Sequence, residues 1–164
     1  MVFLFNIFYY LCKMNIIFLD IDGVMRTYES DCYWSQKLGE PIPDMYKRHF
    51  SPDALENLNY ITLLTGSKIV ITSTWRLFYT LTELKSLFRE RGFRGDIIGV
   101  TGVCDTRGEE IVEWLNEHRI DNFVVIDDNI KDILNRIPEV KVIKCNPLKG
   151  LNDEVFEKSI DILG

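Results

Sequence analysis

The first convincing strand in this chain of 164 residues is predicted within residues 15–24, which read NIIFLDIDGV. The uninterrupted apolar run at 16–19 is typical of a strand that is buried on both faces of a parallel sheet. Asp20 and Asp22 follow at a spacing of two, so an extended chain directs both carboxylates to one side. Gly23 then allows a sharp turn. The segment predicts a buried strand that ends in a pair of acidic side chains.

Further apolar runs alternate with helical patterns along the rest of the chain. Including the first, five strands are predicted, at residues 15–20, 68–72, 96–100, 122–126 and 140–144. The helices between them carry start signals, which are Ser51 with Pro52, Thr80 with Glu83, Thr106 with Glu109, and Asn152. Strands of this kind, alternating with helices, indicate a parallel sheet covered on both faces. We therefore predict an α/β fold, a doubly wound (Rossmann-like) five-stranded parallel sheet, with residues 24–50 as the only long irregular stretch.

Composition sets limits on the class of protein. The chain is 46% hydrophobic and 27% charged, which is the balance of a globular domain and not of a disordered chain. A net charge of −6 disfavours a general polyanion binder, although it leaves room for a local basic pocket that holds one phosphate. The four cysteines are far apart and form no C-x-x-C pair, so we expect reduced thiols in a cytoplasmic protein.

The first twelve residues, MVFLFNIFYYLC, are apolar except for Asn6. A membrane span needs about 20 apolar residues, and a signal peptide needs a basic start and a small-residue cleavage site. Three interpretations stay open, which are an extra packed segment, a weak membrane anchor, and an upstream start codon with Met14 opening the functional chain. We favour the third, and divide the chain into an apolar extension at 1–13 and one domain at 14–164.

Polar side chains follow the predicted strands where each strand ends. They are Asp20 and Asp22 after the first strand, Thr72, Ser73, Thr74, Trp75 and Arg76 after the second, Arg107 a few residues after the third, and Asp127 and Asp128 after the fourth. The carboxyl ends of parallel strands share one edge of a sheet, where ligands bind near a topological switch point. We therefore expect these side chains to lie close together.

The acidic residues of this set predict a metal site. A lone D-x-D is weak, because most acids near loops are solvated or cap helices. A D-x-D-G after one apolar strand together with D-D after another is much stronger. Several carboxylates in one place repel one another unless a cation lies among them, and hard oxygen ligands favour Mg²⁺. The predicted Mg²⁺ ligands are Asp20, Asp22, Asp127 and Asp128.

The same residues carry a resemblance to a known family. FLDIDGV, IVIT, the pair Arg107-Gly108 and VVIDDN resemble, in this order, motifs I to IV of the haloacid dehalogenase-like (HAD) superfamily of phosphatases and phosphotransferases. More narrowly, VITSTWR, GFRGDIIGVT, RGEEIVEWLNEH, VVIDDN and the late Gly150-Leu151 are similar to the HAD domains of "Swiss Army Knife" RNA-repair proteins and their stand-alone relatives. The resemblance covers roughly residues 15–164. It departs from the family at Arg107, where the superfamily usually has lysine.

The resemblance implies a role for each motif residue. Asp20 is the nucleophile that attacks phosphorus and forms an aspartyl-phosphate. Asp22 protonates the leaving oxygen and then activates water, and its backbone carbonyl is a Mg²⁺ ligand. Thr72 is assigned the phosphoryl contact, with Ser73 as the substitute, and Arg107 supplies fixed positive charge.

The paired acids and the residues after the second strand complete the expected site. Asp128 is expected to bind Mg²⁺ directly, and Asp127 to orient waters or Arg107. Trp75 is interpreted either as a platform for a base or as a packing residue, and Arg76 either as a ligand for a second phosphate or as a salt-bridged residue. Ser73 and Thr74 are candidate substrate contacts, and helix capping is the alternative for both.

Together these features predict a Mg²⁺-dependent phosphatase that hydrolyses phosphomonoesters through an aspartyl-phosphate. The 24–50 insertion is short and implies a minimal cap over an open site, which in the superfamily is associated with large substrates. The narrower resemblance points to nucleic-acid ends as the phosphorylated substrate. The alternatives are a non-catalytic Mg²⁺- or phosphate-binding module and a small-molecule (nucleotide or sugar) phosphatase. The sequence predicts no stable membrane span and leaves the oligomeric state undetermined.

Overall fold

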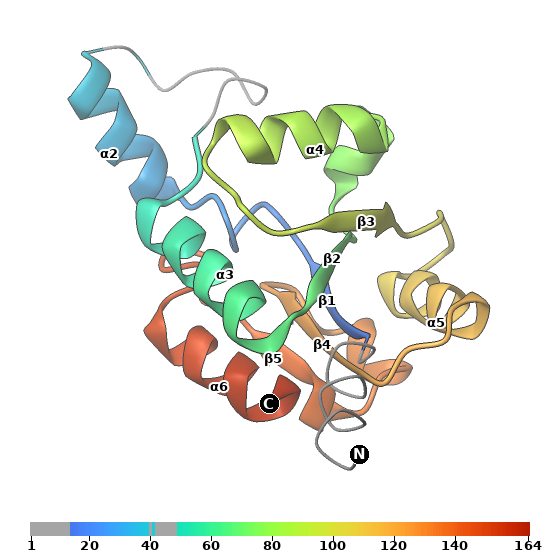
Figure 1. Ribbon diagram of the computed structural model, residues 1–164. Coiled ribbons are helices and arrows are strands. Elements are labelled where there is room, and N and C mark those ends of the chain that lie inside the picture. The colour runs from blue at the N-terminus through green and yellow to red at the C-terminus, as the bar shows by residue number, and fades with distance from the viewer. Residues whose placement is uncertain (1–13, 40, 42–48) are drawn as a thin grey trace, which may run out of the picture.

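The computed structural model describes residues 14–39, 41 and 49–164, and its centre is a five-stranded parallel sheet (Figure 1). The strands lie in the order β3-β2-β1-β4-β5. Their bounds are β1 Asn15–Leu19, β2 Lys68–Ile71, β3 Ile97–Val100, β4 Asn122–Asp127 and β5 Val142–Lys144. The predicted five-stranded parallel α/β sheet is confirmed. The last strand is shorter than predicted, because a 3-10 turn, η4 (Glu139–Lys141), occupies its start.

Helices cover both faces of the sheet, because alternate residues of each strand point to opposite faces. On one face, Ile17 and Leu19 of β1 pack with helices α3 (Pro52–Thr65), α4 (Leu81–Glu90) and α6 (Asp153–Leu163). On the other face, Ile16 and Phe18 pack with α5 (Arg107–Glu117) and the 3-10 turn η3 (Ile133–Asn135). Both faces of β1 are fully buried, as its continuous apolar run predicts.

The predicted helix starts are present. Ser51, Thr80, Thr106 and Asn152 each accept a hydrogen bond from a backbone N–H in the first turn of their helix. Glu83 returns the bond to Thr80 and completes the predicted capping box, whereas Glu109 forms an ion pair with Arg136.

The prediction of an irregular stretch at 24–50 is wrong for residues 28–38, which form helix α2 (Tyr28–Leu38). The helix has both end signals, since Thr27 and Ser30 form a capping box and Gly39 ends it in the left-handed conformation. It escapes a periodicity argument because its inward side is polar. Ser30 and Asp31 are buried, while Tyr28, Tyr33 and Leu38 are exposed.

The chain order of the strands creates a switch point between β1 and β4. β1 is followed along the chain by β2 and β3 on one side, and β4 and β5 then lie on the other. Leu19 pairs with Ile126 in the parallel register, so the next residues, Asp20 and Asp127, leave the sheet side by side. The sheet therefore brings two acids that are 107 residues apart in the sequence to the place where ligands bind in such folds.

The structure also bears on the predictions about membrane spans and cysteines. Among residues 14–39, 41 and 49–164, no helix is long and apolar enough to cross a membrane. The cysteines within those residues are free, and of them Cys145 is buried whereas Cys32 and Cys104 are half-buried. The three interpretations of the apolar segment 1–13 lie outside the described residues, as does part of the 24–50 insertion.

Candidate active site

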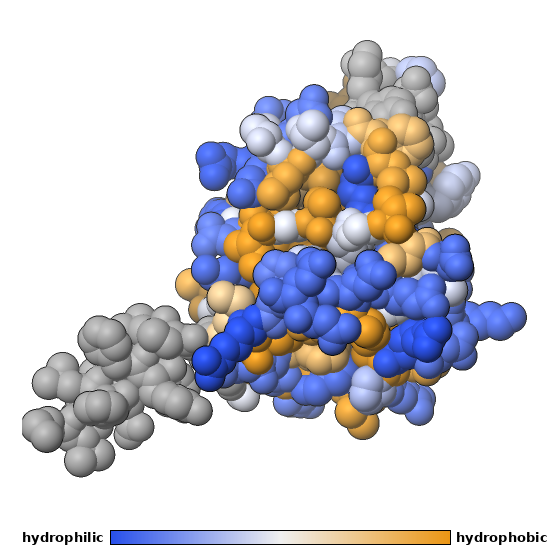
Figure 2. Space-filling model, turned by 90° about the vertical axis from the view of Figure 1, so that its right-hand side faces the viewer, coloured by the Kyte–Doolittle hydropathy of each residue, from blue (hydrophilic) through white to orange (hydrophobic). Residues whose placement is uncertain are grey.

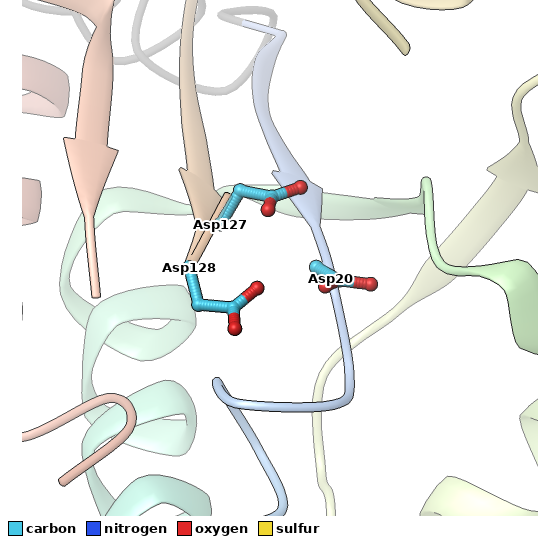
Figure 3. Close-up of side chains that lie close together, drawn as sticks. All are labelled: Asp20, Asp127 and Asp128. Atoms are coloured by element: carbon cyan, nitrogen blue, oxygen red, sulfur yellow. The ribbon is translucent and has the colours of Figure 1, made fainter. Parts of the chain in front are cut away.

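Three carboxylates converge at the switch point of the sheet (Figure 3). Asp20 follows β1, Asp127 ends β4 and Asp128 comes next, and one oxygen from each lies within 4.8 Å of the others. Asp127 is fully buried and Asp20 is 6% exposed. Carboxylates held this close and this dry repel one another strongly, so the arrangement suits a bound cation.

Gly23 makes the approach of Asp128 possible. Its φ of +76° is the left-handed conformation, which favours glycine. A Cβ atom built on Gly23 would lie 2.4 Å from Asp128 Oδ2 and 2.6 Å from its Cγ. The turn after β1 therefore closes directly over the Asp128 carboxylate.

Arg107 supplies positive charge to the cluster from the first turn of α5. Its Nη1 lies 2.5 Å from Asp127 Oδ2 and 3.3 Å from Asp20 Oδ2. Its backbone N–H donates to Asp132 Oδ2 at 2.8 Å, which fixes the start of α5. The Asn129 N–H donates to Asp127 Oδ1 at 2.8 Å, so both oxygens of Asp127 are engaged. Asp127 thus contacts Arg107 directly, and its role in orienting Arg107 or waters stays a prediction.

Burial controls the protonation of these groups. It raises the pKa of Asp20 above its usual value, opposed by Arg107, the Ile21 N–H and the Ser73 hydroxyl, while the Asp128 charge raises it further. Burial and the Asp20 charge raise the pKa of Asp127 to about 7. Burial disfavours the charged form of Arg107, but the carboxylates of Asp20 and Asp127 outweigh it and raise its pKa.

The hydroxyl residues after β2 differ in their access to Asp20. The Ser73 hydroxyl lies close enough to the Asp20 carboxyl to lower the pKa of that carboxyl. Thr72 is fully buried, and its Oγ1 has no hydrogen-bond partner among the described residues. Ser73 also accepts from the Trp75 N–H at 3.4 Å, while Thr74 is exposed and lines the cleft that holds Asp20. Thr72 as the phosphoryl contact stays a prediction, and Ser73 is the hydroxyl that reaches the acidic cluster.

Asp22 lies beside this cluster, and its carboxylate accepts hydrogen bonds from two other side chains. Arg26 Nη1 donates to its Oδ1, and Trp75 Nε1 donates to its Oδ2 at 2.9 Å. Arg26 also pairs with Asp31 of α2 at 2.9 Å, so α2 is tied to Asp22 through one arginine. Trp75 is 2% exposed, which favours the interpretation of this residue as a packing residue. Its role as a platform for a base stays a prediction.

This geometry agrees with a family comparison. A model of the family described as the HAD domain in Swiss Army Knife RNA repair proteins matches residues 16–156. The chain belongs to this HAD-domain family. No curated protein and no solved structure matches it. The superfamily resemblance of the sequence motifs is confirmed, and the acidic cluster of this HAD domain is a candidate metal site.

Several residues of the HAD site carry no signal in the sequence. Arg26 holds Asp22, Asn129 holds Asp127, and Glu110 of α5 lies 2.5 Å from Arg76 and is 6% exposed. The guanidinium of Arg76 already bonds to other groups of the protein. Its predicted contact with a second phosphate stays a prediction. A glutamate in the first turn of a helix, such as Glu110, is ordinarily read as a capping or solvated residue.

The site opens into a cleft of about 430 Å³ lined by Asp20, Thr74, Arg107 and Asp128. Two apolar side chains at its edge, Leu77 and Val103, are 55% and 72% exposed. Figure 2 views the side of the molecule that carries α5 and the end of β3, where apolar side chains are visible next to hydrophilic ones. A larger hollow of about 1290 Å³ runs along α3, and its described lining includes none of the predicted site residues.

Proposed function

We propose that this HAD domain is a Mg²⁺-dependent phosphomonoesterase in which Asp20 is the nucleophile. The observation that carries the proposal is the position of Asp20, which lies within 4.8 Å of the carboxylate of Asp128 and 3.3 Å from the guanidinium of Arg107 in one cleft. A carboxylate attacks a phosphate dianion only when the negative charges are neutralised. Arg107 on one side and a cation site on the other supply that neutralisation.

The donor set fits Mg²⁺. When ionised, the three carboxylates carry a charge of −3, and Arg107 contributes +1, so a divalent cation balances the remainder. Asp20 and Asp128 would hold the ion, together with the Asp22 backbone carbonyl that the family resemblance implies. Asp127, which pairs with Arg107, would orient waters or Arg107 beside the ion. When bound, Mg²⁺ supplies charge neutralisation at the phosphoryl oxygens.

The protein groups then divide the chemistry. An Asp20 carboxylate oxygen attacks phosphorus, the bond to the leaving oxygen breaks, and an aspartyl-phosphate forms on Asp20. Asp22, in its carboxylic acid form, gives a proton to the leaving oxygen; as a carboxylate it then takes one from the water that attacks phosphorus, and the bond between Asp20 and phosphorus breaks to release phosphate. Arg107 and the Ser73 hydroxyl hold phosphoryl oxygens, because both already reach Asp20. Before Asp22 acts, its carboxylate exchanges a bond from Arg26 or Trp75 for one to substrate.

The cleft favours a phosphate at the end of a larger organic molecule. The exposed side chains of Leu77 and Val103 meet whatever is attached to the phosphate. The family description places related domains in RNA repair proteins, which supports nucleic-acid ends as the phosphorylated substrate.

Magnesium should stabilise the HAD domain more strongly as the pH rises through about 7. A buried carboxyl with a raised pKa stabilises the fold fully below its unfolded value near 4, and this stabilisation is lost as the pH rises through the folded pKa, about 7 for Asp127. A cation among the charged carboxylates removes that loss. Thermal unfolding with and without Mg²⁺ at about pH 5.5 and about pH 8 measures the effect. An equal shift of Tm at both pH values would contradict a cation bound within the cluster of Asp20, Asp127 and Asp128.

The proposed activity is tested on the purified protein with a panel of phosphomonoesters. The panel contains an aryl phosphate, oligonucleotides phosphorylated at the 3′ or the 5′ end, nucleotides and sugar phosphates. We expect Mg²⁺-dependent release of phosphate, lost on chelation and restored by added Mg²⁺, with oligonucleotide ends preferred. Turnover without that preference would reject nucleic-acid ends and leave a small-molecule phosphatase. No turnover of any member would reject the enzyme and favour a non-catalytic module.

A further inference from the structure

Arg76 connects three segments at the carboxyl edge of the sheet. It lies in the 3-10 turn η2 (Thr74–Leu77), and Nη1 donates to the backbone carbonyls of Thr72 at 2.5 Å and Ser73 at 2.8 Å. Nε and Nη2 donate to the carbonyl of Gly102, after β3, at 3.3 and 3.2 Å. Nη2 also lies 2.5 Å from Glu110 Oε1 on α5. One guanidinium thus joins the loop after β2, the loop after β3 and the helix that begins with Arg107.

The Arg76–Glu110 ion pair is buried, so its formation requires both charges to be desolvated. Both side chains are buried, with 5% and 7% exposed. Glu110 Oε2 has no hydrogen-bond partner among the described residues. A buried ion pair is often no more stable than apolar residues of the same volume, and an unpartnered buried oxygen adds to its cost. Stability alone therefore gives a poor account of the pair, which borders the cleft of the candidate active site.

Other buried polar groups without a hydrogen-bond partner in the described part of the chain lie near the same pair. Four buried side-chain atoms of the described residues lack a partner, on Asn15, Thr72, Thr101 and Glu110. Arg76 binds the backbone of Thr72, the carbonyl of Gly102 next to Thr101, and the side chain of Glu110. Three of the four groups thus lie on segments that Arg76 holds. Buried polar groups without a partner are rare in folded proteins, and each calls for an explanation such as a functional role or an ordered water.

We propose that Arg76 and Glu110 are a positioning pair, which fixes the hydroxyl segment after β2 and the Arg107 end of α5 relative to Asp20. This inference rests on the proposed function. Neither residue touches the reacting atoms, since Arg76 is occupied by three carbonyls and one carboxylate. The pair instead sets the distance between the groups that grip the phosphoryl group, Ser73 from one side and Arg107 from the other.

The test is kinetic and uses Arg76→Lys, Arg76→Met and Glu110→Gln in the full chain. Lysine keeps the charge but cannot reach all three carbonyls and Glu110 at once. Arg76→Lys should therefore not retain the kcat of the wild type. We expect kcat to fall by about 10²-fold in both Arg76 variants, because small displacements of catalytic groups have effects of that size. KM should change little, because the pair makes no contact with substrate. In a variant that changes both Arg76 and Glu110, the fall in kcat should be smaller than the product of the falls in the two single variants.

A neighbouring ion pair on the same helix provides a matched control. Glu109, next to Glu110, lies 2.7 Å from Arg136, and these side chains are 32% and 55% exposed. Glu109→Gln removes the charge of one partner, and Arg136→Lys replaces the guanidinium of the other, in a pair that does not include Arg76. We expect both to keep kcat within about twofold of the wild type, because exposed ion pairs contribute little.

Hydrogen exchange separates failure of this inference from failure of the proposed function. If the wild type shows Asp20-dependent turnover and Arg76→Lys and Glu110→Gln keep its kcat, the positioning pair is refuted, whatever happens to Tm. If the wild type shows no turnover, the proposed function fails. The pair is then judged by the amides of residues 72–74 and 101–107, which should lose protection in Glu110→Gln and Arg76→Lys but not in Arg136→Lys. Unchanged protection would overturn it, and these variants decide the matter even if Arg76→Met does not fold.

Discussion

Replacement of Asp20 by asparagine should lower phosphate release by at least about 10³-fold, equivalent to about 4 kcal/mol of barrier. Asparagine has nearly the same shape but no carboxylate oxygen to attack phosphorus, so no aspartyl-phosphate forms. Steady-state release of phosphate from the best substrate of the panel, with Mg²⁺ present, measures the loss. The variant should not lower Tm, because Asp20 is a buried carboxyl whose pKa is already raised by burial.

The matched control is Asp161→Asn, the same change at an exposed position of α6. It should leave turnover unchanged. A second readout is the BeF₃⁻ adduct of the nucleophile, an analogue of the aspartyl-phosphate, which should form on the wild type and on Asp161→Asn but not on Asp20→Asn. Normal turnover by Asp20→Asn would falsify the assignment of the nucleophile, whereas loss of turnover in both variants would show that the change in charge alone is responsible.

Substitution of Gly23 by alanine should disable the site even though it adds only one methyl group. The new Cβ would lie 2.4 Å from Asp128 Oδ2 and 3.0 Å from its Cβ, so the whole Asp128 side chain has to move away. We expect Mg²⁺ to lose its stabilising effect on Tm and kcat to fall by about 10²-fold or more, as for other displaced catalytic groups. Thermal unfolding against Mg²⁺ concentration and steady-state kinetics measure the two losses.

Gly66→Ala separates this effect from backbone strain. Gly66 has a φ of +65°, close to the +76° of Gly23, but in the part of the chain that the structure describes, no atom beyond its own neighbours along the chain would lie within 4 Å of an added Cβ. Both variants should lose about 1–2 kcal/mol of stability for a side chain in the left-handed conformation. Only Gly23→Ala should lose the response to Mg²⁺. If Gly66→Ala loses it equally, the contact between Gly23 and Asp128 is not what matters.

The strands and most helices were predictable because their signals are local. A continuous apolar run such as 16–19 indicates a strand buried on both faces, and Ser51 with Pro52 or Thr80 with Glu83 begins a helix by satisfying its first N–H groups. Helix α2 was missed because its buried residues, Ser30 and Asp31, are polar. Its buried Asp31 pairs with Arg26, a contact between side chains that no periodicity describes.

The site was predictable only in part, for a related reason. Parallel strands end at one edge, so Asp20, Asp127 and Asp128 were expected to meet, and their oxygens do lie within 4.8 Å of one another. The partners of Asp22 and Arg76 were not predictable. Arg26 and Glu110 reach them by side-chain geometry, and surface acids and arginines of the same type are common in any sequence.

The amino-acid sequence alone determined the parallel α/β sheet, the family and the acidic edge, because hydrophobic periodicity, capping residues and motif spacing act over short stretches of chain. The tertiary structure alone decided which charges are paired. It placed Asp127 against Arg107, Asp22 against Arg26 and Glu110 against Arg76, because the energy of a charge pair depends on distance and burial, and both are set only when remote segments pack together.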